Sequence, residues 1–195
     1  MPSRALLLIL AAGALAGALA AVVFFGRSGP QTQGTALIGG PFSLTDHTGK
    51  AVTEADFKGR KTLVFFGFTS CPDICPSGLQ VMAAALDKLG SKASSLVPLF
   101  ITVDPERDTA EKLALYVKSF HPSLIGLTGT EEQVKGVAKA YRVYFKKVPD
   151  EKTPGAYSVD HSAFFYLMDE KGKYVRHFSH SVDPETLAAE LAKSL

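Results

Sequence analysis

Residues 65–79 read FFGFTSCPDICPSGL and contain the only two cysteines of the 195-residue chain, Cys71 and Cys75. The β-branched and aromatic run at 63–68 predicts a buried strand, and the apolar positions after Pro76 recur at helical spacing. The cysteines are therefore expected where a strand turns into a helix. The first turn of a helix has unpaired N–H groups and the positive end of its dipole, which both favour a thiolate over a thiol.

The rest of the chain predicts one α/β domain, residues 36–195, because no internal repeat interrupts it and 46% of the sequence is apolar. Turn residues, caps and apolar periodicity predict a hairpin at 41–60 with its turn at 46–50, strands at 61–68, 96–103, 143–148, 163–168 and 174–178, a short strand at 123–127, and helices at 76–89, 110–120, 130–141 and from 183 onward. This order implies a central sheet flanked by helices. A dithiol between the first long strand and its helix is the thioredoxin-like arrangement, at the strand ends where open α/β sheets bind ligands.

Residues 1–27 predict an amino-terminal membrane anchor. They contain Arg4 and Arg27 but no acidic residue, and the apolar run between them has the length of one transmembrane helix. A cleaved signal peptide is the alternative, since residues 18–20 resemble a cleavage site, but the apolar run continues past them. Either way the domain is exported, to the periplasm or an equivalent compartment, beside the inner membrane. Residues 28–35 have the small and polar composition of a flexible tether.

The charge balance argues against a nucleic-acid-binding protein. Without the two arginines of the anchor, the 21 basic residues of the chain fall to 19, which equals the number of acidic residues. The exported part is then formally neutral and has no basic field to attract nucleic acid.

The cysteine spacing favours a metal site over a redox motif. Three residues separate Cys71 from Cys75, whereas the usual redox spacing is two. Four positions on one helical turn put Cβ atoms roughly 5 to 6 Å apart, and a disulfide needs about 3.5 to 4.5 Å. Two sulfurs could instead flank one ion at about 2.3 Å each. Redox chemistry and a plain structural disulfide, which is common in exported proteins, both stay open.

His161 is the candidate third ligand, because it lies beside Asp160 at the mouth of a very apolar strand in SVDHSAFFYLMD. Two thiolates and an imidazole suit copper, and such a set can hold Cu(I) or Cu(II). Structural zinc normally needs a fourth protein ligand, which the sequence does not offer. The other histidines have ordinary explanations, such as a solvated turn for His47; they are His47, His121, His177 and His180.

Three motifs, SCPDICPS, VDPERDT and VDHSAFFYLMD, resemble in that order the signatures of the Sco/SenC copper proteins, from about Gly39 to the carboxyl terminus. The resemblance implies a thioredoxin-like fold with one amino-terminal span and copper bound by Cys71, Cys75 and His161. It also implies a role in building the CuA centre of cytochrome c oxidase, with the copper-site subunit of the oxidase and another periplasmic copper carrier as partners. Ser77 replaces an acidic residue that many relatives have.

Three functions use this site. A membrane-tethered copper metallochaperone is the leading hypothesis, a thiol-disulfide oxidoreductase that needs only Cys71 and Cys75 is the alternative, and a copper or redox sensor is the third. Asp104 and Asp108 are interpreted as turn-forming and helix-capping residues, with Thr109 as the other candidate cap; a role beside the metal is the alternative for both carboxylates. The role of Asp73, between the two cysteines, stays open between holding the loop and contacting a partner.

Overall fold

The structure is a computed structural model that describes residues 38–195. The predicted anchor at 1–27 and tether at 28–35 lie outside the described residues. Between residues 38 and 195, the model has no helix that is both long enough and apolar enough to cross a membrane.

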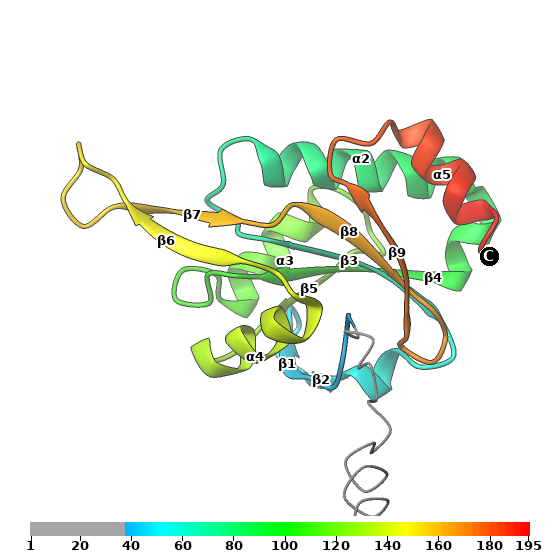
Figure 1. The fold of residues 1–195 in the computed structure, drawn as a ribbon, viewed down its shortest axis with the longest axis horizontal. Helices are drawn as coiled ribbons and strands as arrows, with labels where there is room; N and C mark the ends of the chain where they lie inside the picture. The colour runs from blue at the N-terminus through cyan, green and yellow to red at the C-terminus, as the bar shows by residue number, and fades with distance from the viewer. Residues whose placement is uncertain (1–37) are drawn as a thin grey trace, which may run out of the picture. The chain divides into compact units, whose positions relative to one another are not determined.

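A seven-stranded mixed sheet forms the centre of the domain (Figure 1). Its strand order is β2-β1-β5-β4-β3-β8-β9. The inner strands β3, β4 and β5 pair in parallel, and the flanking strands pair antiparallel. The strands of this sheet are β1 (Ser43–Asp46), β2 (Ala51–Thr53), β3 (Lys61–Gly67), β4 (Leu96–Thr102), β5 (Ile125–Thr128), β8 (Phe164–Met168) and β9 (Tyr174–Ser179).

Helices cover the sheet, as the sequence predicts. In Figure 1, α2 and α5 lie side by side above the sheet and α4 lies below it. Side chains cap two of these helices: Thr130 and Gln133 form a capping box at α4, and the Asp183 side chain accepts from the Thr186 N–H at the start of α5. The helices are α2 (Ile74–Leu89), α3 (Ala110–Lys118), α4 (Glu131–Tyr141) and α5 (Pro184–Ala192), with 3-10 turns η1 (Glu54–Phe57) and η2 (Gly90–Ser95).

The core lies around β3 and β4, whose residues are buried along almost their whole length. A parallel pair covered on both faces needs apolar side chains at every position, which explains the unbroken apolar runs in the sequence. Phe65 packs on Phe165 of the next strand with ring centroids 5.0 Å apart, and both are fully buried. This packing fixes the carboxyl ends of β3 and β4, from which the cysteine loop and the VDPERDT run start.

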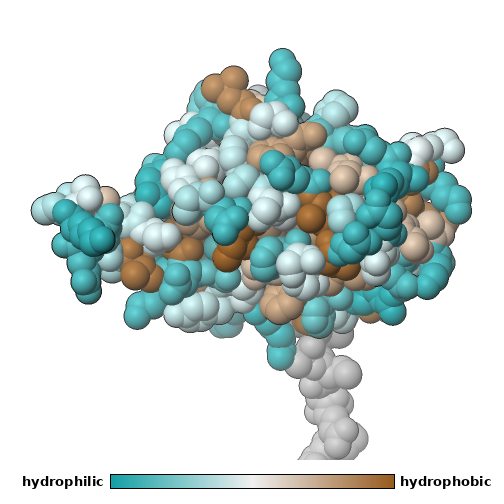
Figure 2. All heavy atoms as spheres, turned by 90° about the horizontal axis from the view of Figure 1, so that it is seen from above, coloured by the Kyte–Doolittle hydropathy of each residue, from teal (hydrophilic) through white to brown (hydrophobic). Residues whose placement is uncertain are grey.

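The strands β6 (Phe145–Pro149) and β7 (Tyr157–His161) form a separate two-stranded sheet that extends from the body, at the left of Figure 1. In the view from above in Figure 2, its tip is hydrophilic and hydrophobic surface lies nearer the body. The sequence predicts β6 but not β7. Only Tyr157 and Val159 are apolar in the first four residues of β7, so the alternation is too short to predict a strand. Its partner β6 is mostly exposed and adds no apolar pattern.

Two details differ from the prediction. Helix α2 begins at Ile74, two residues earlier than expected, because Pro76 is tolerated in the first turn, where N–H groups have no intrahelical partner. Cys75 is therefore helical while Cys71 precedes the helix, and the two do not share one helical turn. His47 is not a solvated turn residue: it is half-buried against β5, where its Nδ1 accepts from the Gly126 N–H at 3.1 Å.

Gly67, at the end of β3, leaves no room for a side chain. A Cβ there would lie 2.7 Å from Cys75 Sγ and 2.8 Å from the Phe100 ring. We expect Gly67→Ala to lower the free energy of unfolding by about 1–3 kcal/mol, the usual cost of overpacking. The measurement is urea-induced unfolding of the full chain. The matched control is Gly136→Ala in α4, where nothing lies within 4 Å of a Cβ, and it should stabilise by roughly 0.5–1 kcal/mol. Equal effects of the two substitutions would contradict the packing argument.

Candidate metal centre

Three residues distant in sequence meet at the carboxyl end of β3. The sulfurs of Cys71 and Cys75 and a ring nitrogen of His161 all lie within 4.8 Å of one another. Cys75 Sγ is 3.3 Å from His161 Nε2. Cys71 comes from the loop after β3, Cys75 from the first turn of α2, and His161 from the end of β7. In the part of the chain that the structure describes, this cluster includes no other histidine.

The cluster is closed on one side and open on the other. Cys75 is fully buried, whereas Cys71 and His161 are half-buried. A groove of about 360 Å³ passes over the exposed sulfur; its lining residues are Phe68, Cys71, Pro72, Asp73, Ile74 and Ser158 to His161. A ligand held here would therefore stay accessible to a second molecule.

The His161 ring is oriented by contacts on two sides. Its Nδ1 is 3.1 Å from the Ser162 carbonyl oxygen. Because a carbonyl can only accept, Nδ1 donates its proton there and the lone pair of a neutral ring lies on Nε2, facing the sulfurs. The Phe68 ring meets the imidazole edge-on at 5.9 Å between centroids. The ring is thus held in the tautomer that a metal would need.

The two thiols differ strongly in acidity. The hydrogen bond from the Cys75 side chain, which outweighs burial and is joined by weaker bonds from the backbone N–H groups of Asp73 and Cys75, lowers the pKa of Cys71 to about 3. The same Cys71 contact, reinforced by burial, raises the pKa of Cys75. One proton therefore stays between the two sulfurs on the Cys75 side. The site has one half-buried thiolate and one buried thiol, and both cysteines are free rather than joined in a disulfide.

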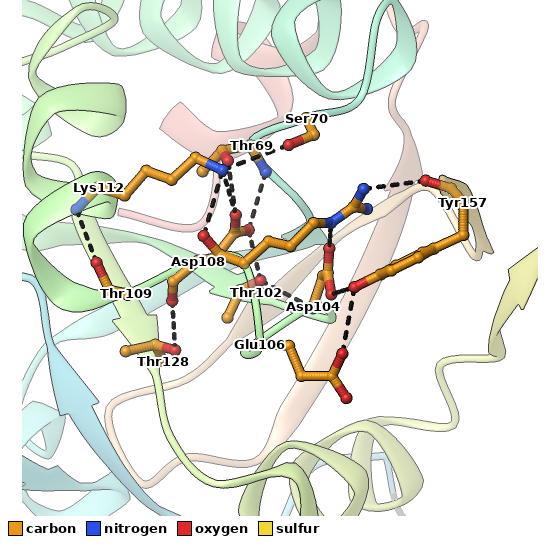
Figure 3. Close-up of polar contacts among 11 residues, drawn as sticks. Thr69, Ser70, Thr102, Asp104, Glu106, Asp108, Thr109, Lys112, Thr128 and Tyr157 are labelled. Carbon is orange, nitrogen blue, oxygen red and sulfur yellow. Dashed lines mark hydrogen bonds and ion pairs between the residues drawn. The ribbon is translucent and has the colours of Figure 1, made fainter. Parts of the chain in front are cut away.

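The fully buried Asp108 fixes the start of the cysteine loop (Figure 3). Its carboxylate accepts from the Thr69 N–H at 2.9 Å, from Thr69 Oγ1 at 2.6 Å and from Thr102 Oγ1 at 2.7 Å. The helix cap is Thr109 instead, whose side chain accepts from the Lys112 N–H. The interpretation of Asp108 as a capping residue is therefore wrong: its partners lie at the ends of β3 and β4.

Asp104 and Arg107 connect the end of β4 to the strand that carries His161. The buried Asp104 carboxylate accepts from Arg107 Nε and from the Tyr157 hydroxyl, the latter at 2.8 Å. Arg107 also donates to the Tyr157 carbonyl at 3.0 Å, and its guanidinium lies 3.8 Å from the centroid of the Tyr157 ring. Asp104 therefore does more than form a turn, because it also holds Arg107 and Tyr157 in place. The sequence prediction missed Arg107 and Tyr157, although Arg107 lies within a motif it quoted.

Asp73 is exposed at the N-cap of α2, and its side chain makes no capping hydrogen bond. Its backbone carbonyl accepts from the Ser77 N–H at 3.0 Å and from Ser77 Oγ at 2.8 Å. Asp73 also lines the groove, where it is available to a second molecule.

The donor set fits copper. Two sulfurs and an imidazole nitrogen form a three-membered soft set of the kind that binds Cu(I), and it also accommodates Cu(II). The cluster in residues 38–195 contains no fourth protein ligand of the kind that structural zinc uses.

The acidity of Cys71 predicts its reactivity. With a pKa of about 3, Cys71 in the metal-free protein should be alkylated by iodoacetamide at a rate that changes little between pH 5 and 8. An ordinary thiol slows about tenfold per pH unit below its pKa of about 8.5, because only the thiolate reacts. The measurement is the alkylation rate at each cysteine, resolved by peptide mass spectrometry. Cys75 is the internal control and should react slowly throughout. A steep decline for Cys71 below pH 8 would contradict the hydrogen-bond assignment.

Comparison with known proteins agrees with this geometry. The protein SCO1 homolog 1, mitochondrial, of Arabidopsis thaliana is 46% identical over 170 residues, covering 87% of this chain but 50% of that relative. This chain therefore spans about half the length of that relative. The crystal structure of Arabidopsis thaliana ScoI with copper bound matches with a TM-score of 0.75 and 48% identity, covering 80% of this chain and 96% of that one.

The structure of Bradyrhizobium japonicum ScoI with copper bound matches with a TM-score of 0.76 and 47% identity, covering 81% of this chain and 99% of that one. Its similarity confirms the predicted thioredoxin-like α/β fold. The family model described as SCO1/SenC matches residues 30–195. The chain belongs to the SCO1/SenC family.

Proposed function

We propose that this protein is a membrane-tethered copper metallochaperone that assists assembly of the CuA centre of cytochrome c oxidase. The observation that carries the proposal is the convergence of Cys71, Cys75 and His161 beside an open groove. The copper-bound state of the similar ScoI structures supports copper as the cargo. The oxidase copper-site subunit is the proposed receiver and another periplasmic copper carrier the proposed donor, as the family resemblance implies.

The arrangement of the donors suits a cargo that has to leave again. The Cys71 thiolate is already ionised and accessible, so it can be the first ligand to meet an incoming ion. Cys75 must lose its proton to bind, so we expect uptake of copper to release a proton. His161 presents Nε2 without rearrangement. Three ligands and one open side leave room for a receiver's sulfur or nitrogen to enter before the protein's own ligands depart.

A thiol-disulfide oxidoreductase that reduces the cysteines of the oxidase copper site is the second candidate, favoured by the unequal acidity of the two thiols. In this role the Cys71 thiolate attacks a partner's disulfide and displaces one partner thiolate. Cys75 then loses its proton and attacks Cys71 Sγ, which releases the second partner thiolate. The partner gains two electrons and the protein becomes the disulfide. His161 contributes no bond to this sequence.

Replacing His161 separates the two functions. His161→Ala should weaken Cu(I) binding by tenfold or more, because one of three ligands is lost, while disulfide exchange stays within about threefold of the wild-type rate. The measurements are an anaerobic Cu(I) titration of the reduced full chain against a competing chelator, and the rate of reduction of a model disulfide. His121→Ala, which removes a histidine outside the cluster, is the matched control. If His161→Ala left the copper affinity unchanged and strongly slowed disulfide exchange, the chaperone proposal would be overturned.

We further propose that residues 1–27 anchor the chain in the inner membrane as a single span, that residues 28–35 tether it, and that residues 36–195 lie in the periplasm or an equivalent exported compartment. The unbroken apolar run in the sequence supports this. After cell fractionation, the intact chain should sediment with membranes and resist extraction by alkaline carbonate. A chain that starts after residue 20 and appears in the soluble fraction would instead establish the cleaved signal peptide.

A further inference from the structure

We infer that the outer edge of β7 is a docking site for an extended segment of the partner polypeptide, a segment in which a cysteine and apolar residues alternate with basic residues. The inference deepens the proposed function, on which it rests, by assigning how the partner is presented to Cys71. The structural basis is the edge of β7 beyond Tyr157, whose carbonyl accepts from Arg107; this edge pairs with no other strand in the described chain and borders the groove over the cluster.

Hydrogen bonds at the two ends of the hairpin define which groups face outward. Asp150 N–H donates to the Ala156 carbonyl at 2.9 Å, and Ser162 N–H donates to the Tyr144 carbonyl at 2.9 Å. Directly opposite residues of an antiparallel pair alternate between bonded and non-bonded pairs. In the register of this hairpin, Val159 and His161 are in non-bonded pairs. Their N–H and C=O groups therefore face away from β6.

The side that these groups face is the groove. Across residues 38–195, β7 pairs with β6 alone, and Val159 and His161 both line the groove opposite the Cys71 loop. An unpaired row of backbone donors and acceptors is a template for one more strand, the interaction known as β-augmentation. An extended chain would run along the strand wall of the groove; the other wall is the turn formed by residues 69–73.

The two faces of the added strand would meet different chemistry. Side chains of directly opposite residues share a face. On the face of Val159 and His161, the added strand would lie over Phe68 and the Cys71 loop, which suits apolar side chains and a cysteine. On the opposite face it would lie beside the exposed Asp160, on the side away from the cross-strand neighbour Lys146, and the carboxylate favours lysine or arginine there.

Charge complementarity selects the same class of partner. The side chains lining the groove include two carboxylates, Asp73 and Asp160, and no lysine or arginine. Ile74 is 41% exposed at this wall and adds apolar surface. A basic and apolar extended segment is therefore favoured over an acidic one, which the carboxylates would repel.

The test uses the full chain, reduced and copper-free, and three blocked seven-residue peptides. The first alternates the two kinds of residue, KVKCKVK; the second has the same composition without alternation, KKVVCKK; the third replaces lysine with glutamate, EVECEVE. Amide exchange rates are measured by NMR at saturating peptide. We expect the first peptide to slow exchange at Val159 and His161 by at least tenfold and to leave Lys147, on the outer edge of β6, unchanged. Equal protection by all three peptides, or none by any, would overturn the inference.

A charge reversal supplies the matched variants. Asp160→Lys should weaken binding of the first peptide at least fivefold, whereas Glu151→Lys, the same charge change at the exposed hairpin tip, should leave it within twofold. Equal weakening by both would show that net charge alone attracts the peptide, which overturns the edge site.

Failure of the docking inference is distinguishable from failure of the chaperone proposal. Copper binding that depends on His161, without amide protection by the peptide, overturns only the docking edge. Amide protection without dependence of copper affinity on His161 overturns only the chaperone proposal.

Discussion

The buried carboxylate of Asp108 is the interaction on which the site depends. It is fully buried and accepts three hydrogen bonds, two from Thr69 and one from Thr102. Thr69 follows β3 and Thr102 ends β4, so one side chain joins the exits of two neighbouring parallel strands. A buried charge is tolerated only when hydrogen bonds replace its lost hydration. Because Asp108 needs these hydrogen bonds, Thr69 is held in one position, and the start of the cysteine loop is fixed with it.

The same strand exit also positions His161. Arg107 follows β4 and contacts Asp104 on one side and Tyr157 of β7 on the other, so the hairpin is tied to the body four residues before His161. The guanidinium lies 5.7 Å from the centroid of the Phe68 ring, which itself touches His161. Cys75 and His161, 86 residues apart, are thereby positioned by one rigid feature, the carboxyl ends of β3 and β4, which also positions Cys71. Binding geometry of this kind requires support from groups that touch neither cargo nor partner.

The sequence predicted the central strands, most of the helices and the three clustered residues, because these depend on local periodicity or on motifs. The strand β7 was missed because only two of its residues, Tyr157 and Val159, are apolar and face the core, which is too short a period to predict a strand; its exposed partner β6 includes Lys146 and Lys147. The role of Asp108 was missed for a different reason. A polar residue beside a helix start has a sufficient local explanation as a cap, whereas its real partner Thr69 is 39 residues away. Long-range polar contacts leave no periodic signal in a single sequence.

The unequal surroundings of the two cysteines connect the fold to the chemistry. Cys75 lies at the amino end of α2 under Gly67, sealed from solvent, while Cys71 lies in a loop at the surface. The hydrogen bond to Cys71, reinforced by burial, keeps a proton on Cys75, and that proton stabilises the charge on Cys71. A pair of equally exposed thiols would lack this division between an accessible nucleophile and a protected second donor. Both proposed functions need this difference between the two cysteines. Copper uptake and disulfide exchange each begin at the accessible sulfur of Cys71, and the protected sulfur of Cys75 then forms the second bond.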